Sequence, residues 1–431
     1  METKTLSPQN TAERVVWTTI VLTYGFYLLG ALYIVAPVVG WSLLAGMLWR
    51  AFRDGSPCTA PSVCRPPAAV WIWALAMLVM LIALVIGHLD FGLGLTQTIK
   101  SSIGWAKGWA LLAVFVWLGQ LNIRPALVYR AAMHVCLHTL LLLPLFIGAW
   151  LLGLPMTPYV SPLQIVGGPG PEFFALNLYE IDPGSGYPRW RLFTPWAPAL
   201  GFVANIYFVF ALQEASLRWR CVGIAGSVVM VLLSGSRLAL LALLTVWLST
   251  AMLRQLRRPL APFVLALGSS LTGLIALPAY AWMEGLWQAF RHARMGSTRV
   301  RETLARIALE RWASEAPVWG HGVVERGPHL VEYMPFGSHH TWFGLLFVKG
   351  AVGLLALAIP LIYSMLQLAR WSNRLRIARV GLAMLLLLFL YTFGENLEIL
   401  AYLIWPALLI TGIAHREVDS ATRAQTELNP S

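Results

Sequence analysis

Two adjacent histidines, His339 and His340, lie in the only long polar segment of an otherwise apolar sequence, inside the run Gly337-Ser338-His339-His340-Thr341-Trp342. A neutral imidazole near pH 7 can act as a general base and take the proton from an attacking hydroxyl group. Two adjacent side chains rarely point into one pocket. We therefore expect one histidine to act as the base, and a surface or packing role remains the alternative for either of them.

The same polar segment is rich in arginine. A guanidinium group binds phosphate oxygens through two parallel hydrogen bonds, so this cluster is suited to an anion such as a diphosphate. The alternative is a solvated helix face that pairs with Glu302, Glu310 and Glu315. The arginines of the segment are Arg291, Arg294, Arg299, Arg301, Arg306, Arg311 and Arg326.

Arg237 is a separate candidate for anion binding, in the short polar turn Ser234-Gly235-Ser236-Arg237 between two apolar runs. A charge at a membrane border is costly unless it snorkels to the interface, pairs or binds a ligand. Snorkelling and anion binding both fit this position. For metal binding the sequence offers little, because the histidines of the polar segment lack HExxH spacing and no Asp accompanies them. We predict no metal site.

The composition predicts a membrane protein that crosses the bilayer many times. Of 431 residues, 58% are hydrophobic and only 12% are charged, which is too apolar for a soluble domain of this size. The net charge of +12 raises the question of nucleic acid. The arginines outside the polar segment, however, sit in short loops between apolar runs, as cytoplasmic loops do near anionic lipid. We therefore expect contact with membrane lipid and no nucleic-acid partner.

Continuous apolar runs without alternation predict an all-α fold with about 12 transmembrane helices and both termini in the cytoplasm. The polar start of the chain disfavours a removable signal peptide. The tail 415–431 is predicted to be cytoplasmic and disordered. The predicted spans are two short helices within Val15–Trp49, followed by 68–87, 108–121, 134–154, 195–212, 221–233, 238–253, 260–282, 350–368, 380–393 and 399–414.

Two long polar stretches interrupt the predicted spans on the extracytoplasmic side. The smaller, 155–194, follows the fifth of the nine spans expected in 1–282 and carries Arg189 and Arg191. The larger, 283–349, which we call the large loop, precedes the last three spans in 350–414. Within it, Ser297–Ser314 is predicted to form an amphipathic helix, because Val300, Leu304, Ile307 and Trp312 recur at helical spacing. Long loops escape the positive-inside rule, so an arginine-rich large loop outside is permitted.

Three short motifs resemble those of O-antigen ligases, O-antigen polymerases and related O-oligosaccharyltransferases. The first is Gly337-Ser338-His339-His340, followed by Trp342-Phe343, Leu345-Leu346 and Gly350-Ala351-Val352-Gly353. The others are Pro317-Val318-Trp319-Gly320-His321-Gly322, similar to a Pro-x-x-Gly-x-Gly pattern, and the Ser-Arg turn at Arg237. Counting back from Gly350 and Gly353 places His339 at the histidine of these families. His340 stands where they usually have Asn, and Lys349 where an acidic or neutral residue is commoner.

The resemblance implies a GT-C-like membrane glycosyltransferase in the inner membrane of a Gram-negative bacterium, with a periplasmic active site in the large loop. It implies inverting, metal-independent transfer of a glycan from undecaprenyl diphosphate, without a cofactor. His339, or as second choice His340, would be the general base, and Glu395 would orient it. The acceptor would be the lipid A core in a ligase, a second lipid-linked glycan in a polymerase, or protein Ser or Thr in an oligosaccharyltransferase. The diphosphate would be bound by Arg237, Arg189, Arg191, Arg291, Arg299, Arg301 and Arg306.

A transporter of lipids or polysaccharides is the alternative from a different class. Transport would require charged residues within the spans, and few are found there. The polar residues are instead concentrated in the loops of one face, which favours an enzyme. The sequence does not separate ligase from polymerase, because acceptor choice depends on the shape of a cavity.

Overall fold

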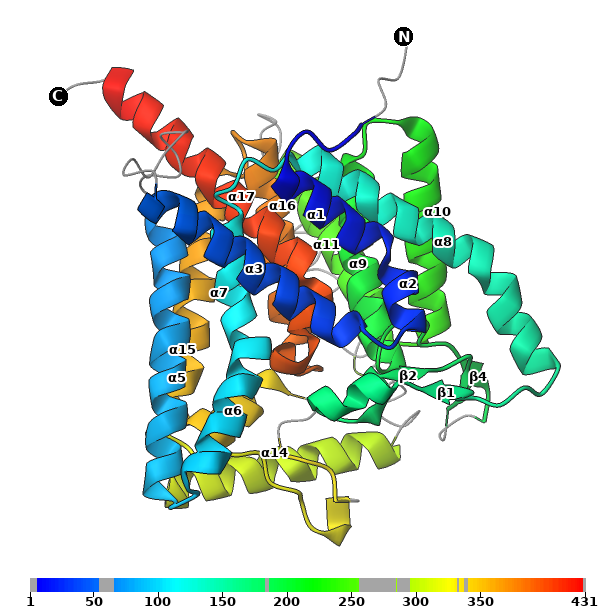
Figure 1. Cartoon of the computed structure of the whole chain (residues 1–431), viewed down its shortest axis with the longest axis vertical. Coiled ribbons are helices and arrows are strands. Elements are labelled where there is room, and N and C mark those ends of the chain that lie inside the picture. Colours follow the sequence, from blue (N-terminus) through cyan, green and yellow to red (C-terminus); the bar gives the residue numbers. More distant parts are fainter. Residues whose placement is uncertain are drawn as a thin grey trace.

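The computed structural model describes residues 6–53, 66–182, 186–255, 295–331, 333–336 and 340–428, together with Glu284. These residues form a bundle of α-helices with two small hairpins of two-residue strands (Figure 1). The helices up to residue 151 are α1 (Thr11–Val21), α2 (Thr23–Leu28), α3 (Leu32–Arg53), α5 (Ala68–Asp90), α6 (Leu95–Lys107), α7 (Trp109–Leu118) and α8 (Pro125–Leu151). The later helices are α9 (Ala197–Gln213), α10 (Leu217–Ser234), α11 (Arg237–Gln255), α14 (Met295–Glu315), α15 (Thr341–Trp371), α16 (Arg376–Tyr391) and α17 (Leu397–Leu428).

Seven helices of the described residues are long and apolar enough to cross a membrane, so the predicted number of twelve is wrong. Some predicted spans are too short when folded. The run predicted at 108–121 forms the ten-residue α7, which reaches membrane length only together with α6. Helix α9 is a shorter apolar helix, and the span predicted at 260–282 lies outside the described residues. The candidate spans are Leu32–Arg53, Ala68–Asp90, Leu95–Leu118, Pro125–Leu151, Leu217–Ser234, Thr341–Trp371 and Leu397–Glu427.

The first apolar region, predicted to form two short helices, breaks at a glycine. Pro37 lies inside α3, whereas the chain turns at Gly30, whose φ of 64° is readily available only to glycine. A Cβ atom on Gly30 would also lie 2.3 Å from the Cβ of Ser161. The predicted pair of spans is therefore the short helices α1 and α2 followed by the single candidate span α3.

The C-terminal tail is another difference from the prediction. Helix α17 continues to Leu428, so the expected disorder is wrong for 415–428. Its extension is held by the fully buried Val418 and by an ion pair of 2.7 Å between Asp419 and Arg423, one helical turn apart. Closer to the centre of the bundle, Gly412 of α17 packs directly on the backbone of α7, where a Cβ atom would lie 2.1 Å from the carbonyl oxygen of Val116.

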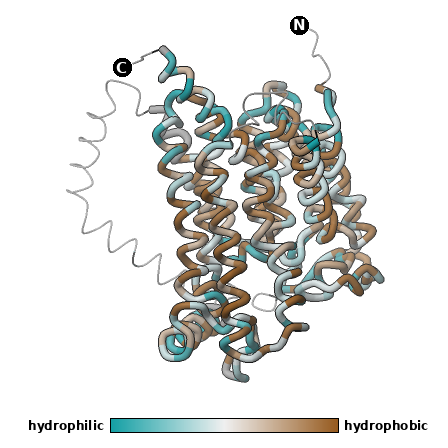
Figure 2. Tube along the Cα trace, turned by 60° about the vertical axis from the view of Figure 1, so that its left-hand side comes forward, coloured by the Kyte–Doolittle hydropathy of each residue, from teal (hydrophilic) through white to brown (hydrophobic). Residues whose placement is uncertain are grey.

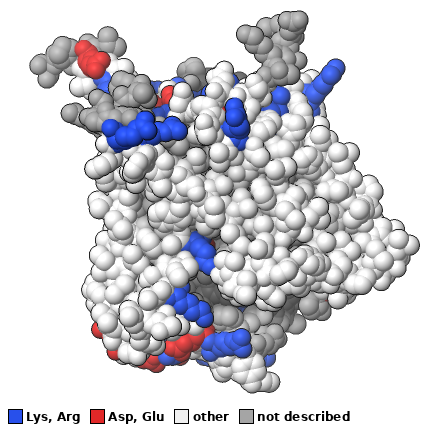
Figure 3. Space-filling model, in the orientation of Figure 1, with Lys and Arg blue, Asp and Glu red and all other residues white. Residues whose placement is uncertain are grey.

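The polar segments gather at one end of the bundle. Figure 1 shows α14 lying across this end, near the hairpins β1 (Tyr159–Val160) with β2 (Ala175–Leu176) and β3 (Glu180–Ile181) with β4 (Pro188–Arg189), while both termini lie at the opposite end. The tube in Figure 2 is predominantly hydrophobic along the long helices. In Figure 3 the charged side chains gather at both ends, with a hollow near α14 and a band without charge between them. This is the distribution that a bilayer requires.

Candidate functional site

Glu395, in the short connection between α16 and α17, is a meeting point of distant segments. Its side chain is only 3% exposed and accepts a hydrogen bond of 2.8 Å from the indole Nε1 of Trp196, 199 residues earlier in the chain. Its backbone carbonyl accepts a hydrogen bond of 2.6 Å from the hydroxyl of Thr341, whose own N–H donates to the carbonyl of Thr392 at 2.9 Å. Trp196, which caps α9 just after the 155–194 loop, and the start of α15 are thus both attached to this connection.

The turn that carries Arg237 lies against the same connection. Helix α10 ends at Ser234, Gly235 adopts the left-handed conformation with φ of 55°, and α11 begins at Arg237, as the predicted tight turn requires. Leu238 packs against Gly394, where a Cβ atom would lie 2.6 Å from its Cδ2. Arg237 is half-buried. Because it directly precedes Leu238, it starts its helix beside the backbone next to Glu395.

Helix α14 brings one residue, Arg301, near Glu395. Burial raises the pKa of the Glu395 carboxyl to about 7, while the hydrogen bond from Trp196 and the positive charge of Arg301 act in the opposite direction. Arg301 is thus within electrostatic reach of Glu395. The predicted apolar face is confirmed for Val300, Leu304 and Ile307, which pack in a small cluster with α15. Arg299, Arg301 and Arg306 are exposed, and Arg291 lies outside the described residues.

The pKa of Glu395 predicts a pH-dependent stability. The folded-state pKa of about 7 lies above the ordinary value of 4.5, so the folded protein holds this proton more tightly than the unfolded chain. The corresponding stability is complete below pH 4.5 and is lost as the pH rises through 7, a change on the order of 3 kcal/mol. Glu395→Gln keeps a neutral acceptor for Trp196, so its melting temperature should fall less between pH 5 and pH 8 than that of the wild type.

Thermal unfolding of purified protein in detergent, measured across this pH range, checks the prediction. Glu310→Gln, which removes an exposed carboxylate from α14, is the matched control and should keep the wild-type pH dependence. Identical pH profiles for Glu395→Gln and the wild type would show that Glu395 does not titrate in this range.

His340 caps the N-terminus of α15. Its Nδ1 accepts the backbone N–H of Phe343 at 3.4 Å, and its ring stacks on Phe343 and contacts Phe393 edge-on. Burial lowers its pKa to about 4, so the ring is neutral at pH 7. Because Nδ1 accepts this bond, the proton of the neutral ring lies on Nε2, and neither nitrogen keeps a free lone pair. This geometry disfavours His340 as a general base. His339 lies outside the described residues.

The capping role makes a prediction about His340. Asn is a preferred N-cap because its side-chain oxygen accepts the same backbone N–H, so His340→Asn should retain both the stability and the activity of the wild type. His340→Ala, which removes the acceptor, should lose about 1 kcal/mol of stability. Thermal unfolding and product formation of both variants measure this. A folded but inactive His340→Asn variant would return the catalytic role to His340.

The two arginines of the smaller loop differ in their surroundings. Arg189 forms ion pairs with Glu180 and, at 3.1 Å, with Asp182, so two carboxylates already neutralise it. Arg191 is 7% exposed and donates one hydrogen bond to the carbonyl of Pro195. Its Nε has no hydrogen-bond partner among the described residues. Of the two, Arg191 is therefore the one with a donor available for a ligand.

Two of the glycine motifs, Pro317 to Gly322 and Gly350 to Gly353, pack together at a break in α15, which we call the joint. Helix α15 begins at Thr341 and not at the predicted 350, and it breaks at Gly350, where φ is 61° and ψ is −163°. The segment from Pro317 to Gly322 occupies the break. His321 and Gly322 donate their N–H groups to the carbonyls of Phe347 and Val348, and those of Ala351 and Val352 donate to the carbonyls of Pro317 and Val318.

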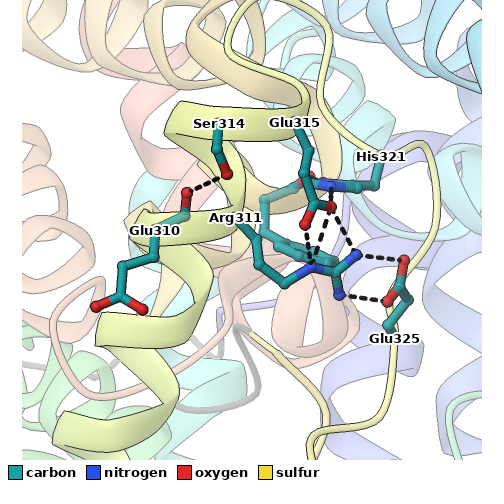
Figure 4. A network of polar contacts seen from close by, with 7 residues as sticks. Glu310, Arg311, Ser314, Glu315, His321 and Glu325 are labelled. Atoms are coloured by element: carbon teal, nitrogen blue, oxygen red, sulfur yellow. Dashed lines mark hydrogen bonds and ion pairs between the residues drawn. The ribbon is translucent and has the colours of Figure 1, made fainter.

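A network of charged side chains holds this joint in place (Figure 4). Arg311 of α14 forms ion pairs with Glu315 at 2.8 Å and with Glu325 at 2.6 Å, and lies over the ring of Phe347. The buried His321 stacks on Phe347 and bonds Glu315 at 2.7 Å. Hydrogen bonds from Arg311 and His321 to the carboxylate of Glu315 lower the pKa of Glu315 to about 2. Pairing with Glu315 was the alternative that the sequence offered for these arginines, and the parts of Glu325 and His321 were missed. Arg311 therefore has a structural role.

Four polar segments therefore converge at one end of the bundle, around a buried carboxyl group that titrates near neutral pH. Among the described residues no group of three or more His, Cys, Asp or Glu side chains could hold a metal ion. Cys136 is buried and Cys221 is exposed, and both are free thiols, while Cys58 and Cys64 lie outside the described residues. Comparison of the sequence with models of protein families and with curated proteins yields no match.

Proposed function

We propose that the chain is a membrane glycosyltransferase of the O-antigen ligase type. It would transfer a glycan from undecaprenyl diphosphate to a hydroxyl group of the lipid A core oligosaccharide and so complete lipopolysaccharide. The observation that carries this proposal is the convergence at Glu395, where the Arg237 turn, the Trp196 loop, the start of α15 after His339 and the arginine face of α14 meet. The three sequence motifs that resemble this family all lie in or next to these segments.

The chemistry needs a base and a cationic site. His339 would take the proton of the acceptor hydroxyl, whose oxygen attacks the anomeric carbon from the side opposite the diphosphate. The bond from that carbon to the diphosphate oxygen breaks, and the carrier leaves with an additional negative charge. Arg237, Arg191 and the exposed arginines of α14 would stabilise this charge. The diphosphate is already an activated leaving group, so the proposed reaction requires no metal ion.

The proposed orientation places the α14 end of the bundle in the periplasm and both termini in the cytoplasm. It rests on the positive-inside count, because the arginines of the short loops are assigned to the end that holds the termini. The glycan and the acceptor would then meet at the periplasmic surface of the inner membrane.

Arg237 tests the cationic site. Arg237→Ala should reduce the use of the lipid-linked donor more than Arg237→Lys, because Lys keeps the charge but cannot form two parallel hydrogen bonds with phosphate. Initial rates over a range of donor concentrations measure the difference. Wild-type kinetics in both variants would remove Arg237 from the donor site.

The reaction itself is tested with purified protein in lipid nanodiscs, lipid-linked glycan as donor and lipid A core as the only added acceptor. Glycan on lipid A core supports the ligase. A longer lipid-linked glycan would indicate a polymerase, and transfer to an added Ser/Thr peptide would indicate an oligosaccharyltransferase. Translocation of the donor across a bilayer without any product would support the transporter.

A further inference from the structure

The end of α8 and the first half of the smaller loop carry no charge. No Asp, Glu, Lys or Arg occurs in the sequence between Arg130 and Glu172. Every residue from 151 to 169 except Ser161 is exposed, and we call 151–169 the uncharged segment. The second half of the loop differs, because its hairpin of β3 and β4 contains the ion pairs of Arg189. The smaller loop therefore has two surfaces of different character.

The exposed side chains of the uncharged segment are mostly large and apolar. In the 3₁₀ helix η1 (Pro162–Val166), Ile165 is 90% exposed and Val166 is 51% exposed. The segment also exposes Leu152, Leu154, Met156, Tyr159, Val160 and Leu163. Large apolar patches on a protein surface mark contacts with a membrane or with another protein. This surface is therefore expected to be covered.

The backbone of the uncharged segment is held by the rest of the fold. The N–H of Ser161 donates to the carbonyl of Phe174 at 3.0 Å, and its hydroxyl donates to the carbonyl of Leu29 at 2.9 Å. Strand β1 pairs with β2, which satisfies further backbone groups. The three prolines within 151–166 have no N–H that would need a partner in an apolar environment. They are Pro155, Pro158 and Pro162. The segment is thus suited to the boundary layer of a bilayer.

The uncharged segment continues the lipid-facing surface of α8. Leu141 and Leu145 are exposed on this candidate span, and the exposed apolar side chains continue through Leu152 into the hairpin of β1 and β2. Figure 1 shows this hairpin higher in the view than α14 and than the lower end of α5, which is also a candidate span. A bilayer that covers α5 over its length therefore reaches the level of the uncharged segment.

We propose that the uncharged segment is an interfacial anchor, whose apolar side chains enter the lipid leaflet at the α14 end of the bundle. A protein partner fits less well. Protein interfaces typically have a polar rim that supplies hydrogen bonds, whereas the uncharged segment has no charged residue and continues the surface of α8. Tyr159 is a residue type that is enriched at the boundary between lipid and water.

The anchor does not depend on the proposed function. Its consequence for the candidate site follows from the chain itself, because the same loop continues to Arg191 and then to Trp196, which donates to Glu395. Lipid contact at the uncharged segment would hold this side of the site at the surface of the membrane.

Labelling by lipid tests the contact directly. Purified protein is placed in phosphatidylcholine nanodiscs that contain some of the same lipid with a photoreactive diazirine on its acyl chain, close to the glycerol. After irradiation, mass spectrometry should find lipid attached to peptides of the uncharged segment and to α8. Tyr333 of the large loop is 57% exposed, but Glu325 and Arg326 precede it and the loop lies outside the spans. Its peptide should carry no lipid.

Two variants separate insertion from mere proximity to the membrane. Ile165→Asp places a carboxylate in η1, so the uncharged segment should lose most of its label while α8 keeps its own. The variant should fold normally, because the replaced side chain is almost fully exposed. Tyr333→Asp is the matched control and should leave all labelling unchanged.

The anchor would be overturned by an unlabelled segment beside a labelled α8, by equal labelling of the Tyr333 peptide, or by full labelling of the segment in Ile165→Asp. Nanodiscs that hold two copies of the chain, with the segment unlabelled, would show that a second copy covers this surface instead.

Discussion

Replacing His339 by alanine is expected to lower the rate of glycan transfer by about 100- to 10,000-fold, the usual contribution of a general base. The acceptor hydroxyl is a weak nucleophile until its proton is removed, and His340, the second choice for this role, uses its Nδ1 to cap α15. Binding of the lipid-linked donor should persist, because the arginines proposed to bind the diphosphate are unchanged. Initial rates with lipid-linked glycan and lipid A core, together with thermal unfolding, measure the effect.

His340→Asn is the matched control for this experiment. It changes the neighbouring imidazole, keeps the cap of α15 and should retain the wild-type rate. A wild-type rate in folded His339→Ala protein would contradict the base assignment. An active His339→Ala beside an inactive His340→Asn would move the base by one residue.

The sequence was a good guide to the type of fold and a poor one to its number of spans. Hydropathy identifies an apolar run but not where a helix within it ends. Gly30 ends one helix with a left-handed turn, while Pro37 a few residues later does not interrupt α3. The opposite error occurs at His415, where a polar composition predicts disorder and α17 continues. In both cases, packing against distant segments decides where the helix ends, and local composition does not reveal this packing.

In the candidate site, too, local features were predictable from the sequence and long-range contacts were not. The spacing of Val300, Leu304 and Ile307 was sufficient to predict the buried face of α14, because helical periodicity is a local property. The environment of Glu395 was not predictable, since its partner Trp196 lies 199 residues away. Without these long-range contacts, a sequence cannot show which carboxyl group is buried and therefore titrates near neutral pH.

The arginines illustrate why charge alone is an incomplete signal. Arg189 and Arg191 are two residues apart and were predicted to act alike. One pairs with Glu180 and Asp182, and the other is buried with a free Nε among the described residues. Arg311, which the sequence grouped with its neighbours on α14, instead holds the joint at Gly350. Which arginine can bind a diphosphate depends on the acids that fold next to it.

Gly350→Ala is expected to destabilise the protein by several kcal/mol, and to abolish transfer with it. The backbone of Gly350, with φ of 61° and ψ of −163°, lies in a region that is essentially restricted to glycine. An added Cβ atom would also lie 2.2 Å from the carbonyl oxygen of Val318. Relief of this contact requires the Pro317 to Gly322 segment to leave the break in α15, and the N–H and carbonyl groups that pair there would be left buried without partners.

Gly148→Ala provides the matched control, because a Cβ atom on Gly148 inside α8 would meet nothing within 4 Å. The same substitution there should be neutral or slightly stabilising, since alanine favours the helix. Thermal unfolding and transfer rates of the two variants then isolate the joint from the general effect of adding a methyl group. If Gly350→Ala matched the wild type in both measurements, the break in α15 would not be needed to hold the large loop, and the glycine motif would require a different explanation.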